Sequence, residues 1–273
     1  MVEGVAPAVP RVGGIGFTIA RVMGLILVVI GLGELLLFGI LSWLDAATLE
    51  SMYPGAEVHR LHGLGQAIIA WVLALCIAVQ VWRPREWFAA AVLGLAALSF
   101  YTAAAMVSGL VDPLAIIGIV VLVTLVWLHP ARRGATFMPV KAVVLLLAAP
   151  LIVGAVAFAG AELQIQLAAD AADPHAALGH YGALAALAAT IVSAVIIGSS
   201  SLPGSTLSGW LGVAAAVAFG VASVVFPAAA SSLGIGLELA LVVAGLAFGA
   251  GLLASRGASR EAIDREPYPQ RAS

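Results

Sequence analysis

The feature that most constrains this chain is a series of eight apolar runs separated by short polar links. About 20 predominantly apolar residues form a helix that crosses the hydrocarbon core of a bilayer. A mean hydropathy of +1.13, with only 10% charged residues, excludes a soluble domain with a polar surface. The sequence therefore predicts an all-α membrane protein with eight transmembrane helices, at 16–44, 55–82, 87–108, 113–128, 139–167, 173–198, 210–226 and 234–255.

The spacing of proline predicts that these helices form two tandem four-helix bundles. Thirty positions separate Pro54 from Pro84, and 29 separate Pro174 from Pro203. An even number of helices in each half makes such an internal repeat parallel, related by an axis along the membrane normal. The predicted divisions are a cytoplasmic tail (1–15), a first bundle (16–133), a second bundle (134–255) and a disordered cytoplasmic tail (256–273).

The distribution of charge predicts the orientation in the membrane. Arginines gather in the two tails and in the links on the same side, for example Arg83 and Arg132, whereas the opposite links carry acids such as Asp45 and Asp173. The positive-inside rule then places both termini in the cytoplasm, in a multi-pass protein of the inner (plasma) membrane. The alanine-rich, lysine-poor composition is typical of a bacterial protein.

Composition also limits the partners. The formal net charge of −2 gives no basic surface for nucleic acid, and Cys76, the single cysteine, excludes an intrachain disulfide or a cysteine-built metal site. The expected partners are the lipid bilayer and, as candidates, other membrane subunits.

Titratable and polar residues inside the apolar runs are the candidate functional residues, since such groups are costly in lipid unless they are paired or face a cavity. Counting 1.5 Å per residue from the helix ends places them in one layer near the extracytoplasmic face. We expect this layer to be a ligand or proton site, with the three histidines as candidate metal ligands and the metal itself unknown. Its members are Glu34, His59, His62, Gln66, Glu162, His180 and Glu238.

His175 is excluded from this layer by helical geometry. It precedes His180 by five residues, which on one continuous helix turns it by about 140° away from His180. We expect it at the membrane interface.

The segment Glu57-Val58-His59-Arg60, within an eight-helix chain of two bundles, resembles haem A synthase. That family has an acid-x-x-His-Arg motif and axial histidines, so the resemblance implies haem held in the membrane and a redox activity. This chain has one spacer residue where the family has two, no outer-half histidine in the fourth and eighth helices, and no outer-loop cysteine pair.

Three functions remain open from the sequence. The favoured interpretation is a non-enzymatic accessory or scaffold protein, or a protein that binds a small molecule or ion at the histidine and glutamate layer. The alternatives are a proton-coupled transporter and a haem- or metal-binding membrane oxidoreductase. No catalytic residues are predicted, because nucleophile-elbow, Walker and HExxH motifs are absent from the sequence.

Overall fold

The computed structural model describes residues 14–52, 55–82, 84, 86–135, 142–170 and 172–265. Side chains are described for these residues except 31–32, 34–36, 38, 56–57, 134 and 256–265. Within this part of the chain every regular element is helical. The elements are α1 (Ile15–Leu41), α2 (Ala46–Met52), η1 (Ala56–His59), α3 (Arg60–Trp82), α4 (Phe88–Val107), α5 (Pro113–Leu128), η2 (Arg132–Gly134), α6 (Ala142–Ala168), α7 (Pro174–Ala177), α8 (His180–Gly198), α9 (Ser205–Val225) and α10 (Ile235–Arg265).

Helix length and hydropathy indicate a protein embedded in a membrane. Among the described residues, six helices are long and apolar enough to cross a bilayer: α3, α4, α6, α8, α9 and the Ile235–Ser255 part of α10. Two further apolar segments, Ile15–Ile30 in α1 and Pro113–Leu128, are shorter. The all-helical class is confirmed, whereas the count of eight crossings stays a prediction.

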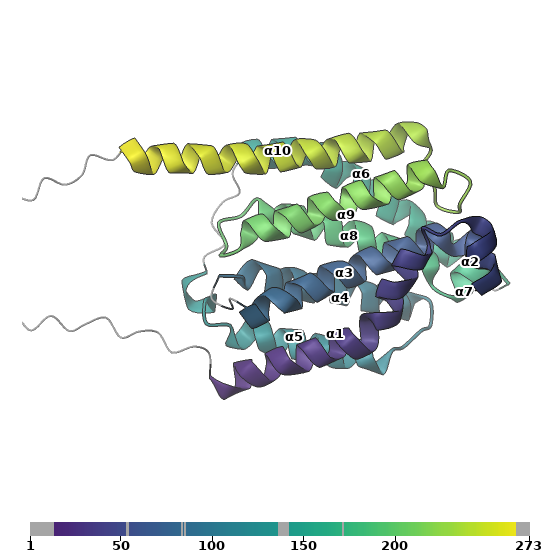
Figure 1. Cartoon of the computed structure of the whole chain (residues 1–273), viewed down its shortest axis with the longest axis horizontal. Helices are drawn as coiled ribbons and strands as arrows, with labels where there is room; N and C mark the ends of the chain where they lie inside the picture. The colour runs from purple at the N-terminus through teal and green to yellow at the C-terminus, as the bar shows by residue number, and fades with distance from the viewer. Residues whose placement is uncertain are drawn as a thin grey trace, which may run out of the picture.

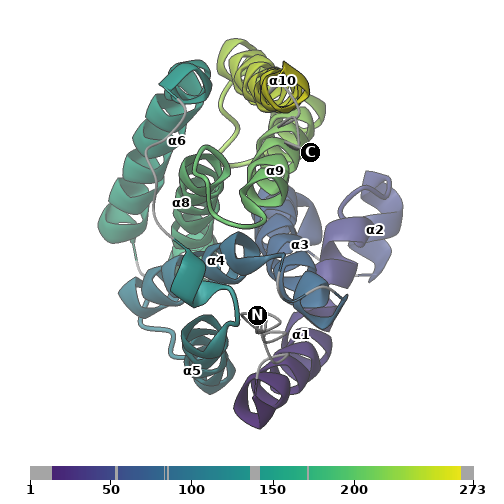
Figure 2. The same cartoon turned by 90° about the vertical axis from the view of Figure 1, so that its left-hand side faces the viewer.

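The four helices α3, α4, α8 and α9 occupy the middle of the molecule, as the end-on view shows (Figure 2). On one side α1 contacts α3 and α5, and α5 contacts α4; on the other side α6 contacts α8 and α10, and α10 contacts α9. The same neighbour relations therefore occur in both halves. The halves are not separate bodies, because α3 and α4 pack directly against α8 and α9. The proposed duplication stays a prediction.

Helices α3 and α8 both begin at the same end of the molecule, beside the short helices α2 and α7 (Figure 1). Helix α1 begins, and α10 ends, at the opposite end (Figure 1). The elements that carry the predicted histidines are thus brought to one end of the bundle.

The segment predicted as one helix over 173–198 is interrupted. Asp173 caps α7 by accepting hydrogen bonds from the backbone N–H groups of His175 and Ala176, at 2.8 and 3.3 Å, and α7 ends at Ala177. Gly179 has a left-handed backbone, with φ of 68°, which glycine adopts without strain. A new helix then begins at His180. The break changes the relative direction of the two histidines that flank it.

Glycine allows the helices of the second half to approach closely. A Cβ atom added at Gly198 of α8 would collide with the Cα atom of Gly209 in α9, and it would lie 2.8 Å from the Gly209 nitrogen. Helices inside lipid gain no hydrophobic driving force for association, so the van der Waals packing that small residues permit stabilises such crossings. This contact fixes α8 against α9.

Candidate metal centre

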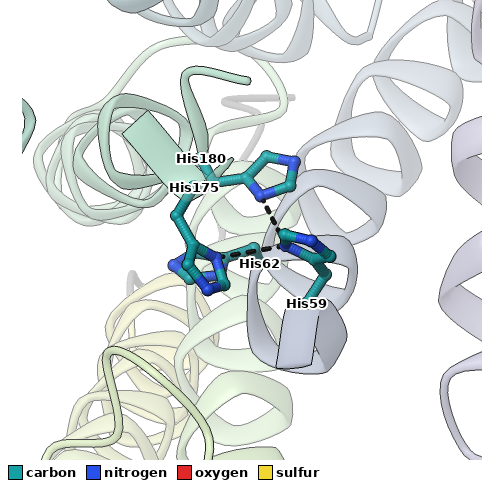
Figure 3. Close-up of side chains that lie close together, drawn as sticks. All are labelled: His59, His62, His175 and His180. Atoms are coloured by element: carbon teal, nitrogen blue, oxygen red, sulfur yellow. Dashed lines mark hydrogen bonds between the residues drawn. The ribbon is translucent and has the colours of Figure 1, made fainter. Parts of the chain in front are cut away.

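Four histidines converge at the end of the bundle where α3 and α8 begin. His59 is the last residue of η1, and His62 lies in the first turn of α3. His175 lies on α7, and His180 is the first residue of α8. Figure 3 shows the four imidazoles turned toward one another, two from each half of the chain.

The distances within this histidine cluster suit a single metal ion. The Nδ1 atom of His59 lies 3.1 Å from Nδ1 of His175 and 3.1 Å from Nδ1 of His180. The Nδ1 atoms of His175 and His62 are also 3.1 Å apart. One ligand nitrogen from each of the four rings lies within 4.8 Å of all the others. Nitrogens bound tetrahedrally to one zinc ion are about 3.4 Å apart. The three 3.1 Å contacts are close to that spacing, and a separation of 4.8 Å would shorten by about 1.4 Å on binding.

Protons alone do not satisfy these contacts. An imidazole nitrogen carries either one proton or one lone pair, and that group points in one direction in the ring plane. Nevertheless Nδ1 of His59 and Nδ1 of His175 each make two short contacts. At least one of the contacts is therefore left without a well-directed hydrogen bond. A cation at the centre would meet the lone pairs of all four rings.

The other ring nitrogen of His62, Nε2, contacts Ser231, which lies outside the cluster. Ser231, in the link between α9 and α10, donates its hydroxyl hydrogen to Oε2 of Glu162 at 2.9 Å. Since that hydrogen is used, the 3.1 Å contact between Nε2 of His62 and the Ser231 oxygen has the histidine as the donor. His62 is fully buried and Glu162 on α6 is 3% exposed.

Glutamine and tyrosine side chains hold the interrupted segment that carries His175 and His180. Gln166 of α6 donates to the carbonyl of Ala176 at 2.8 Å and accepts from the N–H of Gly182 at 3.2 Å, so it joins α7 to α8. Tyr181 donates its hydroxyl to Asp173 at 3.3 Å. These hydrogen bonds fix the two histidines on either side of the break.

The environment of His59 favours its neutral form. Burial lowers the pKa of His59, and the neighbouring His175 lowers it further, although Asp173 acts in the opposite direction. Neutral imidazole is the form that ligates a metal.

A cavity of about 550 Å³ reaches the histidine cluster. It is lined by Val58, Arg60, His175, Val225 and residues 226–230. The next turn of each helix is closed by buried leucines, among them Leu64 and Leu184, and a Cβ atom added at Gly65 would collide with the Leu184 side chain. The cluster is thus reached from the end of the bundle, and buried leucines lie in the next turn of each helix.

The other residues of the predicted layer have different surroundings. Gln66 lines two small cavities together with Tyr101, one turn further into α3. Glu238 of α10 is fully buried and accepts a hydrogen bond from Ser232 at 2.6 Å. Glu34 belongs to α1, but its side chain is outside the described part of the structure. Of the predicted layer, His59, His62 and His180 lie in the cluster, and Glu162 is linked to it through Ser231.

The structure corrects the expectation for His175, which joins the cluster. The expected angle of about 140° assumed a continuous helix, and the break at Gly179 removes that assumption. Glycine directly before His180 was the available signal in the sequence. Ser231 was also missed, and nothing in its local sequence marks it.

Four converging imidazoles define the chemistry that this centre supports. Imidazole nitrogen suits zinc, copper, iron and nickel, and affinity among divalent ions rises to a maximum at Cu²⁺ and is lower for Zn²⁺. A haem would need two axial histidines on opposite faces of a broad macrocycle. Here the ring centroids of His59 and His175 are 4.4 Å apart and those of His62 and His180 are 5.2 Å apart, so the rings are in direct contact. The arrangement does not fit a porphyrin.

Comparison of the chain with protein-family models, curated proteins and solved structures finds no match. The functional argument therefore depends on the geometry of the cluster.

Proposed function

We propose that this membrane protein binds one divalent transition-metal ion, Zn²⁺ or Cu²⁺, through His59, His62, His175 and His180. The observation that carries the proposal is the convergence of one nitrogen from each ring within 4.8 Å. Burying four imidazoles against one another leaves short contacts that protons do not satisfy, and a bound cation removes that cost.

The arrangement of the helices supports a role for the metal in joining the two halves of the chain. Each half supplies two histidines, from the end of η1 and the start of α3 in one case and from α7 and the start of α8 in the other. We propose that the halves are related by an internal duplication of four helices each, with the metal at their junction. Sites at the interface of repeats are common in membrane proteins built in this way.

The proposed topology places the centre at the extracytoplasmic face of a bacterial inner membrane. The acidic links, including Asp45 and Asp173, lie at the same end as the cluster, which the positive-inside rule assigns to the outside. The cavity lined by Arg60 and His175 then gives metal ions access from that side.

The packing favours metal binding without transport. Leu64, Leu184 and Leu187 are buried within the next two turns of α3 and α8 beyond the histidines. A proton-coupled transporter would require a polar route past these side chains, because ions do not cross dry apolar packing. We therefore propose a metal-binding accessory protein with no catalytic step assigned.

Equilibrium binding of Zn²⁺ and Cu²⁺ to the purified protein in detergent tests the proposal. One ion is expected for each wild-type chain, and none in a variant that carries alanine at all four histidines. His129 provides the matched control, since it is a buried histidine at the C-terminal end of α5 that donates to Gln80 at 3.1 Å and is not part of the cluster. Equal binding by the wild-type and four-alanine proteins would overturn the proposal.

A further inference from the structure

We infer that Ser231 and Glu162 are positioning residues that fix His62 in the Nε2–H tautomer, so that its Nδ1 lone pair points into the cluster. This inference deepens the proposed function and rests on it for its consequence, metal affinity. The hydrogen-bond chain runs from His62 Nε2 to the Ser231 oxygen, over 3.1 Å, and from the Ser231 hydroxyl to Glu162, over 2.9 Å.

The direction of this chain follows from the groups involved. A carboxylate only accepts hydrogen bonds, so the single hydroxyl hydrogen of Ser231 points at Glu162. The serine oxygen then has only lone pairs to offer His62, which must carry its proton on Nε2. Metal-bound histidines commonly donate their other N–H to a carboxylate or another acceptor, which fixes the tautomer and strengthens the ligand.

The backbone of Ser231 is held in an uncommon conformation. Its φ is 65°, and it is the one non-glycine residue with positive φ in the described part of the chain. Such a conformation is unfavourable for a residue with a Cβ atom and persists where the surroundings over-determine it. The contacts with His62 and Glu162 are such surroundings, which separates this serine from an ordinary turn residue.

In its ionised form Glu162 would also supply charge where the proposed metal needs it. Four neutral imidazoles leave the full 2+ charge on a bound ion, and an uncompensated charge away from water is costly. Glu162 is 3% exposed and reaches His62 through one hydroxyl group.

The adjacent pair Ser232 and Glu238 provides a matched control. Ser232 donates to Glu238 at 2.6 Å, so this pair has the same chemistry one position along the chain. Neither residue belongs to the histidine cluster. Variants of the two pairs therefore separate an effect on His62 from a general effect on the link between α9 and α10.

The test measures the His62 tautomer and the zinc affinity separately. The ¹⁵N spectrum of the metal-free protein, labelled at histidine, is expected to show His62 as Nε2–H in the wild type. Ser231→Gly relaxes the backbone but removes the hydroxyl, and Glu162→Gln offers an amide donor that permits the reversed chain. Both variants should shift His62 toward Nδ1–H and weaken zinc binding by about 10- to 100-fold. Ser232→Ala and Glu238→Gln should leave both readouts unchanged.

The two readouts keep this inference distinct from the proposed function. Wild-type protein that binds no Zn²⁺ would defeat the metal proposal, while the metal-free spectrum would still decide the role of Ser231 and Glu162. An Nδ1–H tautomer in the wild type, or an unchanged tautomer in both Ser231→Gly and Glu162→Gln, would overturn the inference.

Discussion

The Nδ1 atom of His59 lies 3.1 Å from the Nδ1 atom of His180, although 121 positions separate the two residues in the chain. This contact joins the end of η1, directly before α3, to the start of α8, so one half of the chain supplies ligands that complete the set from the other half. A metal at this point would cross-link the central helices.

Removing one ligand should weaken metal binding strongly. His180→Ala leaves three imidazoles, and we expect a loss of zinc affinity of about 100-fold or more, since even changes to the groups behind a ligand cost 10- to 100-fold. Competition titration with a chelating dye would measure the loss. His129→Ala should bind zinc as the wild type does, and a similar loss in that variant would indicate a general defect in folding.

Bound metal should stabilise the folded protein. At a free zinc concentration 100 times the dissociation constant, a ligand that binds only the folded state adds about 2.7 kcal/mol. The thermal midpoint should therefore rise with zinc concentration and fall again when EDTA is added. His62→Ala should show a much smaller rise at the same zinc concentration. A zinc-dependent shift of equal size in His62→Ala would place the ion elsewhere in the molecule.

Stability should fall in acid partly because of His129. Burial lowers its pKa to about 4 from the ordinary 6.5, so the unfolded chain binds more protons than the folded protein between these pH values. Its contribution is complete above pH 6.5 and is lost as the pH falls toward 4, with a magnitude on the order of 2 kcal/mol once solvent screening is allowed for. His129→Gln should flatten this part of the stability profile in chemical denaturation. A slope equal to that of the wild type would contradict the assignment.

The close crossing of α8 and α9 should not tolerate a side chain. Gly198→Ala would force its Cβ atom against the backbone of Gly209, and we expect a destabilisation of about 1–3 kcal/mol. Gly154→Ala on α6 is the matched control, because nothing lies within 4 Å of the added Cβ atom. Thermal unfolding in detergent should show a lower midpoint for the first variant and an unchanged or higher midpoint for the second. Equal midpoints would contradict the close packing.

The sequence was sufficient to predict the helical membrane class and three of the four clustered histidines. Apolar runs of helical length predict the membrane class, and the cost of titratable groups in lipid identifies the histidines as candidate functional residues. Depth along a helix does not specify a partner, however. Glu238 has a depth similar to that of Glu162. Nevertheless Glu238 contacts Ser232, whereas Glu162 contacts Ser231 and is linked through it to the cluster.

The remaining members of the site depend on tertiary contacts. His175 faces the cluster because α7 ends before α8 begins, and a prediction of one continuous helix turns it the wrong way. Ser231 lies 169 positions from His62, and two adjacent serines in a short link are typical of a turn. Only the packing of α3, α6 and the link between α9 and α10 brings its hydroxyl to the ring.

X-ray absorption spectroscopy of the protein loaded with one equivalent of Zn²⁺ tests the central claim most directly. The account predicts a first shell of four imidazole nitrogens at about 2.0–2.1 Å, with the outer-shell scattering that imidazole rings produce. A first shell of mainly oxygen ligands, or a zinc content that does not reach one ion per chain, would contradict it.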